Sequence, residues 1–187
     1  MADKIKIGRK TVGKGQPTYV IAEVGINHNG NFDTAVKLID QAAFAGADAV
    51  KLQTYITEKR VKADSPIFGI LKQCELNFTQ QKKLFDYAKK KGIDVFSTPF
   101  DQESVDFLAS VDCPCYKVAS FDIVNKNLLV KISEQSKPVI MSRGMADKKE
   151  IDEAVSIFNE KHIPYALLHC ISAYPVNDFT NLNLSTI

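Results

Sequence analysis

The sequence predicts an α/β fold: a TIM-type (β/α)8 barrel of which only about six strand–helix units are present, preceded by an N-terminal β-hairpin. Short apolar runs alternate along the chain with amphipathic helical segments, which is typical of a parallel sheet. The apolar runs are continuous, as expected for strands buried on both faces. No G-x-G-x-x-G motif follows the first of these strands, which disfavours a dinucleotide-binding fold.

The first elements are expected close to the N-terminus. Residues 4–7 alternate charged and apolar side chains, and with a turn they predict a hairpin that ends at Gly13. The first strand of the parallel sheet is expected at residues 19–24. A helix follows from about residues 31–33, and Gly46 ends it as a C-terminal cap.

The later elements follow the same alternation. The second strand is expected at residues 49–54, and a longer, looser segment follows at residues 55–75. Four further strands are expected at residues 94–98, 116–120, 138–142 and 165–170. The helices between them are expected to begin near Thr79, Asp101, Leu128 and Asp147, the last with a capping box completed by Glu150.

A complete barrel needs eight strands and about 250 residues. We therefore expect residues 1–187 to form a single, incomplete barrel domain with two unpaired sheet edges. Either the chain is a fragment of a longer protein, or a partner chain completes the barrel. An open, doubly wound sheet of six strands is the alternative.

The composition favours a cytoplasmic enzyme. The net charge of +2 gives no reason to expect a nucleic-acid or membrane partner. The N-terminus lacks the apolar core of a signal peptide, and no stretch approaches the roughly 18 apolar residues of a membrane span. The four cysteines include no C-x-x-C pair, so they are expected to be reduced thiols without a zinc site.

Polar side chains fall at or near the C-terminal ends of the predicted strands, the face that carries the active site in a barrel. These residues are Glu23, Lys51, Gln53, Ser97, Lys117, Ser120, Ser142 and His169. We expect Lys51 and Lys117 to extend from neighbouring strand ends into one basin, where two serine hydroxyls would help them bind a phosphate.

Two carboxylates, Glu23 and Asp122, are expected at the same mouth, where they could bind hydroxyls or a metal or move a proton. The residues alone therefore predict an enzyme acting on a small phosphorylated substrate. The competing interpretation is that each lysine simply pairs with a carboxylate inside the barrel.

Four segments resemble the sialic acid synthase family, which includes N-acetylneuraminate, legionaminate and pseudaminate synthases. They are "YVIAEVGINHNGNFDTAVKLIDQAAFAGADAVKLQTY", "FSTPFD", "YKVAS" and "HCISAYP", and the resemblance runs from about residue 18 to residue 184. It implies condensation of phosphoenolpyruvate with an N-acylated hexosamine to a nine-carbon 2-keto sugar acid, with release of phosphate by C–O cleavage.

The resemblance also implies roles for individual residues. Lys51 and Lys117 match the lysines that bind phosphoenolpyruvate, and Ser120 and Ser142 match serines that contact its phosphate. The remaining implied roles are catalysis for Glu23 and Asp122, and sugar or substrate binding for Gln53, Ser172 and Tyr174.

Three positions depart from the family pattern. Asp122 stands where many members have Glu, and Ser172 stands where N-acetylneuraminate synthases typically have Asn. Arg143 replaces the threonine of the family's S-T-G-M motif, where it could meet an anion or solvent. Some segments look more like pseudaminate synthases and others more like N-acetylneuraminate and legionaminate synthases, which leaves the acceptor sugar open.

No metal ligand is expected within the chain. The resemblance implies Mn²⁺ or Mg²⁺ in the full-length enzyme, with its two histidine ligands beyond residue 187, together with a sugar-binding Asp and a small C-terminal antifreeze-like (SAF) domain. His28 is expected to be a loop residue and His162 to be exposed, whereas His169 could be a core residue or a substrate contact. Family members are homodimers.

Two rival functions remain open. The chain could be a non-catalytic fragment that at most binds phosphoenolpyruvate. It could also be another phosphoenolpyruvate-condensing barrel, such as a 3-deoxy-octulosonate phosphate synthase, although "GINHNG" and "KLQT" together argue against that.

Overall fold

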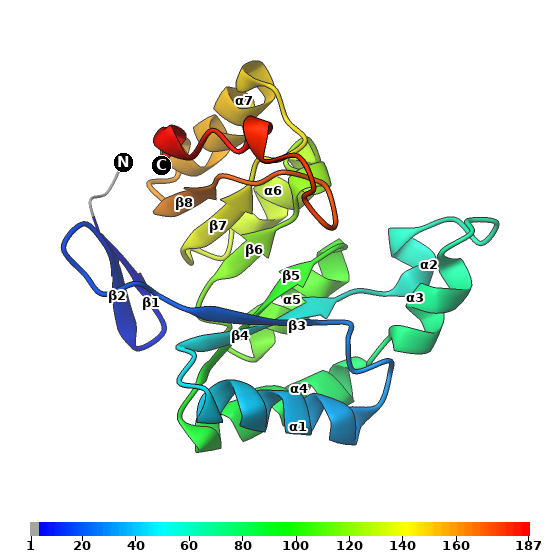
Figure 1. Ribbon diagram of the computed structural model, residues 1–187. Helices are drawn as coiled ribbons and strands as arrows, with labels where there is room; N and C mark the ends of the chain where they lie inside the picture. The colour runs from blue at the N-terminus through cyan, green and yellow to red at the C-terminus, as the bar shows by residue number, and fades with distance from the viewer. Residues whose placement is uncertain (1–3) are drawn as a thin grey trace.

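The computed structural model describes residues 4–187 and begins with the predicted hairpin (Figure 1). Strands β1 (Lys4–Ile7) and β2 (Lys10–Gly13) pair antiparallel. The hairpin is fastened to the sheet by ion pairs from Arg9 to Asp94 and from Lys10 to Asp48. Because both aspartates lie at the starts of sheet strands, the hairpin sits at the amino-terminal ends of the strands, away from the predicted active-site face.

Six parallel strands form one curled sheet in sequence order (Figure 1). They are β3 (Ile21–Gly25), β4 (Ala49–Thr54), β5 (Asp94–Pro99), β6 (Tyr116–Val118), β7 (Val139–Ser142) and β8 (Tyr165–Leu168). A doubly wound sheet reverses its strand order at a switch point. The unbroken order excludes that alternative for residues 4–187, and β3 and β8 form the two edges.

Helices follow the strands and cover the outer face of the sheet (Figure 1). The five longer helices are α1 (Phe32–Phe44), α4 (Phe78–Lys91), α5 (Gln102–Ser110), α6 (Lys126–Ser133) and α7 (Lys148–Glu160). The predicted caps at Asp101 and Asp147 are confirmed. The predicted start at Thr79 is one residue late, because Asn77 caps α4 in a capping box with Gln80 and the helix begins at Phe78. Helix α1 has Ala45 as its C-cap, with Gly46 one residue beyond it.

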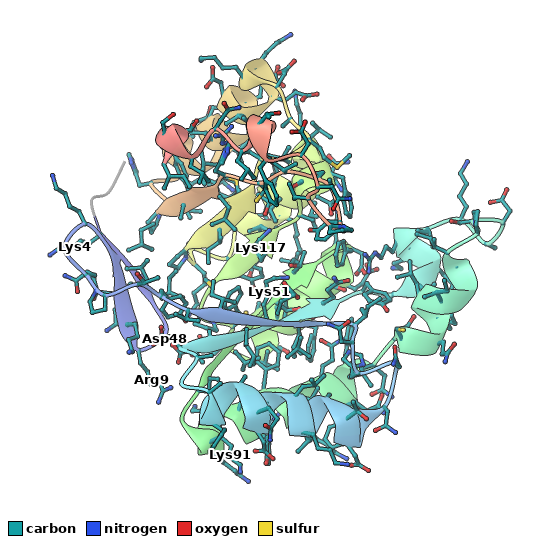
Figure 2. All side chains as sticks on the ribbon, in the orientation of Figure 1. Lys4, Arg9, Asp48, Lys51, Lys91 and Lys117 are labelled. Carbon is teal, nitrogen blue, oxygen red and sulfur yellow. The ribbon has the colours of Figure 1, made fainter. Side chains whose placement is uncertain are left out.

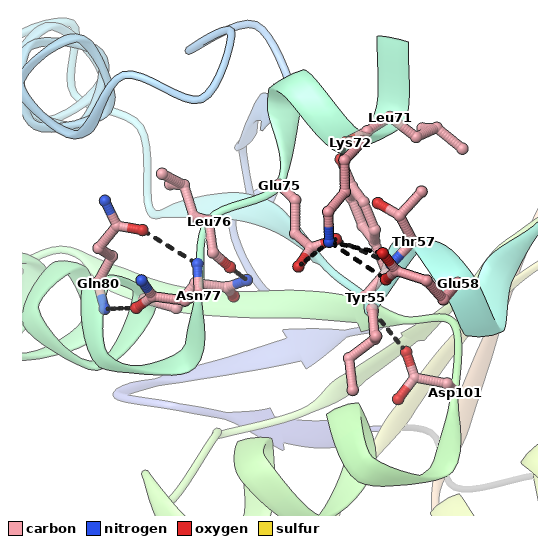
Figure 3. Close-up of polar contacts among 12 residues, drawn as sticks. Tyr55, Thr57, Glu58, Leu71, Lys72, Glu75, Leu76, Asn77, Gln80 and Asp101 are labelled. Atoms are coloured by element: carbon pink, nitrogen blue, oxygen red, sulfur yellow. Dashed lines mark hydrogen bonds and ion pairs between the residues drawn. The ribbon is translucent and has the colours of Figure 1, made fainter. Parts of the chain in front are cut away.

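The segment at residues 55–75, predicted to be loose, is ordered by tertiary hydrogen bonds (Figure 3). It contains two short helices, α2 (Thr57–Arg60) and α3 (Phe68–Cys74). The Tyr55 hydroxyl donates to the Leu71 carbonyl, and the Thr57 amide donates to the Glu75 carboxylate. These contacts hold α2 against α3 at the carboxyl end of β4.

Apolar side chains fill the space between the sheet and its helices. Among the largest fully buried ones are Tyr116 on the sheet and Leu84, Leu129 and Phe158 on the helices. The four cysteines are free thiols, and three of them are buried. Between residues 4 and 187, no helix is both long and apolar enough to cross a lipid bilayer.

Two strands end earlier than predicted, and this shapes the mouth of the sheet. The run at 116–120 forms β6 only as far as Val118, and Ser120 begins a 3₁₀ turn, η1 (Ser120–Asp122). The run at 165–170 forms β8 only as far as Leu168. The chain beyond it is irregular apart from the 3₁₀ turns η2 (Phe179–Asn181) and η3 (Leu184–Thr186).

Candidate active site

A cavity of about 720 Å³ lies at the carboxyl ends of the parallel strands. Eight of the nine predicted site residues line it: Glu23, Lys51, Gln53, Lys117, Ser120, Ser142, Ser172 and Tyr174. Lys51 and Lys117 extend into the space that the curled sheet partly encloses (Figure 2). The ninth residue, Asp122, is not part of the lining.

Lys51 forms an ion pair inside the cavity. Its Nζ lies 2.6 Å from a Glu23 carboxylate oxygen and 3.4 Å from the Thr98 hydroxyl. The register places Glu23 on β3 beside Lys51 on β4, so the two side chains start from adjacent strands. The alternative interpretation, that each lysine pairs with a carboxylate of the chain itself, is therefore correct for Lys51 in this structure.

Lys117 has no such carboxylate partner among the described residues. Its buried ammonium donates to the Val118 carbonyl at 2.5 Å and to the Ser142 hydroxyl at 2.6 Å. Burial, and then repulsion by Lys51, lowers the pKa of Lys117 from its usual 10.5 to about 8. A buried cation that meets only neutral oxygens is costly, and a bound anion would relieve that cost.

The prediction that the two lysines extend from neighbouring strands is wrong. Lys51 lies on β4 and Lys117 on β6, with β5 between them. They approach each other because the sheet is curled and both side chains point to its concave side. Thr98, at the end of the intervening β5, completes this polar wall.

The serines lie beside the lysines in different ways. Ser142 ends β7 and accepts the hydrogen bond from Lys117. Ser120 opens η1, and its hydroxyl accepts the Gly144 amide at 3.3 Å. Both hydroxyls retain a proton that they can donate to a phosphate oxygen.

Asp122, the last residue of η1, is buried and does not line the cavity. One carboxylate oxygen accepts from the Asn125 side chain at 3.4 Å, and the other is buried without a partner in residues 4–187. Burial raises the pKa of Asp122, against the opposing effects of Asn125 and the nearby Arg60 guanidinium. Its catalytic role stays a prediction, and in this conformation nothing brings it to the cavity.

Ser172 and Tyr174 line the cavity from the irregular chain after β8. Tyr174 is almost fully exposed, with 98% of its surface accessible. A Cβ on Gly144 would come within 2.9 Å of both the Cys170 carbonyl and the Ser172 hydroxyl. The chain after β8 therefore packs closely on the loop after β7.

Sequence reasoning missed Arg60, which lines the cavity from α2. Its Nη1 donates to the Gln53 side-chain oxygen at 3.0 Å, and its guanidinium lies over the rings of Phe100 and Tyr55. The segment that carries Arg60 has no helical period of useful length. Its place in the sequence, six residues after Thr54 at the end of β4, was the only signal that could have placed Arg60 near the mouth.

The three histidines have structural surroundings. His28 is buried in its loop, where Nδ1 accepts the Gly30 amide at 3.1 Å and burial lowers the pKa. His162 is exposed, as predicted. His169 lies between Arg143 and the Leu182 carbonyl, each at 2.7 Å; since a guanidinium only donates, Nδ1 accepts and Nε2 donates. Arg143 thus meets a histidine, rather than an anion or solvent alone.

The chain is similar to known proteins of one family. Residues 38–187 match the model of the NeuB family. An uncharacterized protein of Methanocaldococcus jannaschii is 44% identical over 99% of this chain and 55% of its own length. An N,N'-diacetyllegionaminic acid synthase of Campylobacter jejuni is 38% identical over 91% of this chain and 56% of its own length. The chain thus spans about half the length of these relatives.

A solved structure has the same fold. The N-acetylneuraminic acid synthetase of Leptospira borgpetersenii, crystallised with citrate, superposes with a TM-score of 0.94 at 38% identity. The match covers 98% of this chain and 64% of that one. On these grounds the chain belongs to the NeuB family.

Proposed function

We propose that this chain carries the phosphoenolpyruvate-binding part of a sialic acid synthase-type transferase. The reaction joins phosphoenolpyruvate to an N-acylated hexosamine, giving a nine-carbon 2-keto sugar acid and phosphate. The observation that carries the proposal is the buried ammonium of Lys117, which meets two neutral oxygens and no carboxylate in the described chain. A phosphate or carboxylate of the substrate would supply the missing charge.

The substrate anions would bind between the two lysines. Lys51 and Lys117 would neutralise the phosphate and the carboxylate of phosphoenolpyruvate, and the hydroxyls of Ser120 and Ser142 would donate to phosphate oxygens. Bound in this way, the enol is held with C3 free to attack the aldehyde carbon of the sugar. Water then adds at C2, and the C–O bond to phosphate breaks.

Glu23 is the carboxylate best placed to move a proton during these steps. It lines the cavity, is half exposed, and is held at 2.6 Å by Lys51. It would take a proton from the water that attacks C2. Gln53, Ser172 and Tyr174 would contact the acceptor sugar from the same cavity, and Asp122 could join them only after η1 moves.

The remaining parts of the enzyme are proposed on the resemblance. Two further strands would close the sheet into an eight-stranded barrel. Within residues 4–187 no three His, Cys, Asp or Glu side chains come together as a metal site, so these residues alone do not fit the expected Mn²⁺ or Mg²⁺. No step above runs through that ion. A homodimer, or a partner chain that completes the barrel, and a cytoplasmic location also remain predictions.

Phosphate release tests the proposal. The purified protein is incubated with Mn²⁺, phosphoenolpyruvate and either N-acetylmannosamine or its 2,4-diacetamido analogues. Release with one sugar identifies the acceptor and separates N-acetylneuraminate synthesis from pseudaminate or legionaminate synthesis. No release with any sugar, from a folded sample, overturns catalysis by this chain and favours a non-catalytic protein that binds phosphoenolpyruvate.

Calorimetry tests the binding site separately. Phosphoenolpyruvate is titrated into the wild type, Lys51→Ala and the control Lys59→Ala, whose lysine pairs with Glu103 outside the cavity. We expect Lys51→Ala to weaken binding by at least about tenfold, because a charged hydrogen bond is worth about 1.5–3 kcal/mol. Equal affinity in all three proteins removes Lys51 from the phosphate-binding role.

A further inference from the structure

Arg60 lines the same cavity as the two lysines, and the proposed reaction gives it no role. It is the last residue of α2, and its guanidinium carbon lies 3.6 Å from the centre of the Phe100 ring and 4.7 Å from that of Tyr55. Both are cation–π distances. The two aromatic rings therefore fix the position of a half-buried cation at the wall of the cavity.

The hydrogen bond from Arg60 determines how the Gln53 side chain is oriented. Nη1 of Arg60 donates to Oε1 of Gln53 at 3.0 Å. Arginine has donors only, so Gln53 has to turn its oxygen towards Arg60 and its NH₂ group away from it. Arg60 thereby makes Gln53 a hydrogen-bond donor on its other side.

The NH₂ group of Gln53 faces the part of the cavity where Glu23 lies. A Cβ on Gly25 would be 3.6 Å from Nε2 of Gln53 and 3.0 Å from Oε1 of Glu23, so both groups border the same point. The Glu23 carboxylate is engaged by Lys51. Within residues 4–187 no hydrogen bond from Nε2 of Gln53 is formed, so this donor is available to a ligand.

The guanidinium of Arg60 is already engaged by side chains of the protein itself. Asp122 lies near enough to stabilise the guanidinium charge, although burial lowers the pKa of Arg60. The anion-binding lysines belong to other elements, β4 and β6. An amide NH₂ group only donates, so it pairs with an oxygen that carries lone pairs, such as a carbonyl oxygen.

We propose that Arg60 is a positioning residue that holds the Gln53 amide so that its NH₂ group donates to a carbonyl oxygen of the acceptor sugar. The inference rests on the proposed function, since it names part of the acceptor site. The carbonyl oxygen can belong to the acyl group or to the open-chain aldehyde. In either case Arg60 acts through Gln53 and selects an acceptor that carries a carbonyl at this point.

Sugar binding to the protein saturated with phosphoenolpyruvate tests the inference. Three probes separate the two sources of the oxygen: N-acetylmannosamine carries both carbonyls, its alditol carries only the acyl group, and mannose carries only the aldehyde. The variants are Arg60→Met and the control Lys59→Met, which changes the neighbouring cation on the same helix outside the cavity.

We expect Arg60→Met to raise the Kd for N-acetylmannosamine about tenfold, since a misdirected amide loses one hydrogen bond and buries an unpaired group. The Kd for phosphoenolpyruvate should stay unchanged, which separates positioning of Gln53 from general damage. An equal loss for the alditol identifies the acyl oxygen, and a loss confined to the aldehyde sugars identifies the aldehyde. Unchanged affinity for all three sugars, or the same loss in Lys59→Met, overturns the inference.

A second variant covers the case in which Arg60→Met fails to fold. Gln53→Glu keeps the size of the side chain but replaces the NH₂ donor with an oxygen that Arg60 can bind as an ion pair. It should fold and lose the same affinity for the sugar; full affinity in this variant overturns the inference.

If the wild type binds the sugars but releases no phosphate, the proposed function fails and the Arg60 inference is decided by binding alone. If the wild type binds none of the three sugars, the inference is overturned.

Discussion

The Nζ of Lys51 lies 2.6 Å from a carboxylate oxygen of Glu23, across the adjacent strands β3 and β4. An anion that binds Lys51 therefore competes with a carboxylate that the chain itself supplies. The ion pair holds the Lys51 side chain in the cavity before any ligand arrives. Substrate binding would then release Glu23 from its ion pair, at the stage when a carboxylate is needed to move a proton.

Removing that competitor should strengthen anion binding. We expect Glu23→Gln to bind phosphoenolpyruvate several-fold more tightly while losing phosphate release, because Lys51 is freed but the proton acceptor is gone. Calorimetry and a phosphate assay measure the two effects. Glu103→Gln is a matched control, since Glu103 is similarly exposed and pairs with Lys59 outside the cavity. Weaker binding in Glu23→Gln would show instead that Glu23 orients Lys51 for the ligand.

The lowered pKa of Lys117, about 8, predicts how substrate binding depends on pH. The ammonium loses its proton as the pH rises through 8, so affinity for phosphoenolpyruvate should fall about tenfold between pH 7.5 and pH 9.5. Calorimetric titrations at several pH values follow this change. In Lys117→Met the affinity should be low at every pH, with a much flatter profile. An unchanged wild-type affinity up to pH 9.5 contradicts the role.

The same group predicts an opposite trend for stability without ligand. Because the pKa of Lys117 is lower in the folded state than its usual 10.5, the unfolded chain binds more protons between pH 8 and pH 10.5, and stability from this group rises with pH there. We expect the free energy of unfolding to gain about 2 kcal/mol from pH 7 to pH 9.5, relative to Lys117→Met. Urea unfolding at both pH values measures the difference. Parallel pH profiles in the two proteins contradict the prediction.

The sequence predicted the sheet well because its strands carry strong local signals. Continuous apolar runs located all six parallel strands, and the polar residues at their ends located the cavity. Contacts distant in sequence were not predictable in this way. Lys51 and Lys117 converge across β5 only because the sheet curls, and the partner of Arg143 is 26 residues away in the sequence.

The short helices could not be predicted from the sequence either. Helix α2 has four residues, too few for a periodic pattern, and tertiary hydrogen bonds rather than propensity hold it in place. Arg60 enters the cavity only because α2 is held there. Asp122 shows the converse. Its residue type and position suggested catalysis, but β6 ends early at Val118 and Asp122 lies buried at the end of η1.

Two glycines with the same backbone conformation test how tightly the loop after β3 is packed. Gly30 and Gly46 have φ values of +75° and +79°, but a Cβ on Gly30 would lie 2.0 Å from the Gln73 carbonyl, whereas Gly46 has open space. Gly46→Ala should cost about 1 kcal/mol of stability for the left-handed backbone. Gly30→Ala should cost clearly more, about 3 kcal/mol, because the backbone also has to shift. If urea unfolding shows equal losses of stability in the two variants, the α3 backbone at Gln73 moves aside at little cost.

His169 connects the chain after β8 to the loop after β7 through two hydrogen bonds. Its ring accepts from Arg143 and donates to the Leu182 carbonyl, each at 2.7 Å, so it joins the loop after β7 to the C-terminal segment at residues 179–187. We expect His169→Ala to speed hydrogen exchange of the amides in that segment roughly tenfold, since one hydrogen bond is worth about 1 kcal/mol and a buried partner is left unpaired.

Hydrogen exchange read by mass spectrometry separates this local effect from a general loss of stability. Peptides from β4 and β5 should exchange as in the wild type, and the exposed His162→Ala should change neither region. Because the chain between His169 and that segment carries Ser172 and Tyr174 at the cavity wall, His169→Ala should also weaken sugar binding more than phosphoenolpyruvate binding. Unchanged exchange at residues 179–187 would mean that packing of the segment, rather than His169, holds it in place.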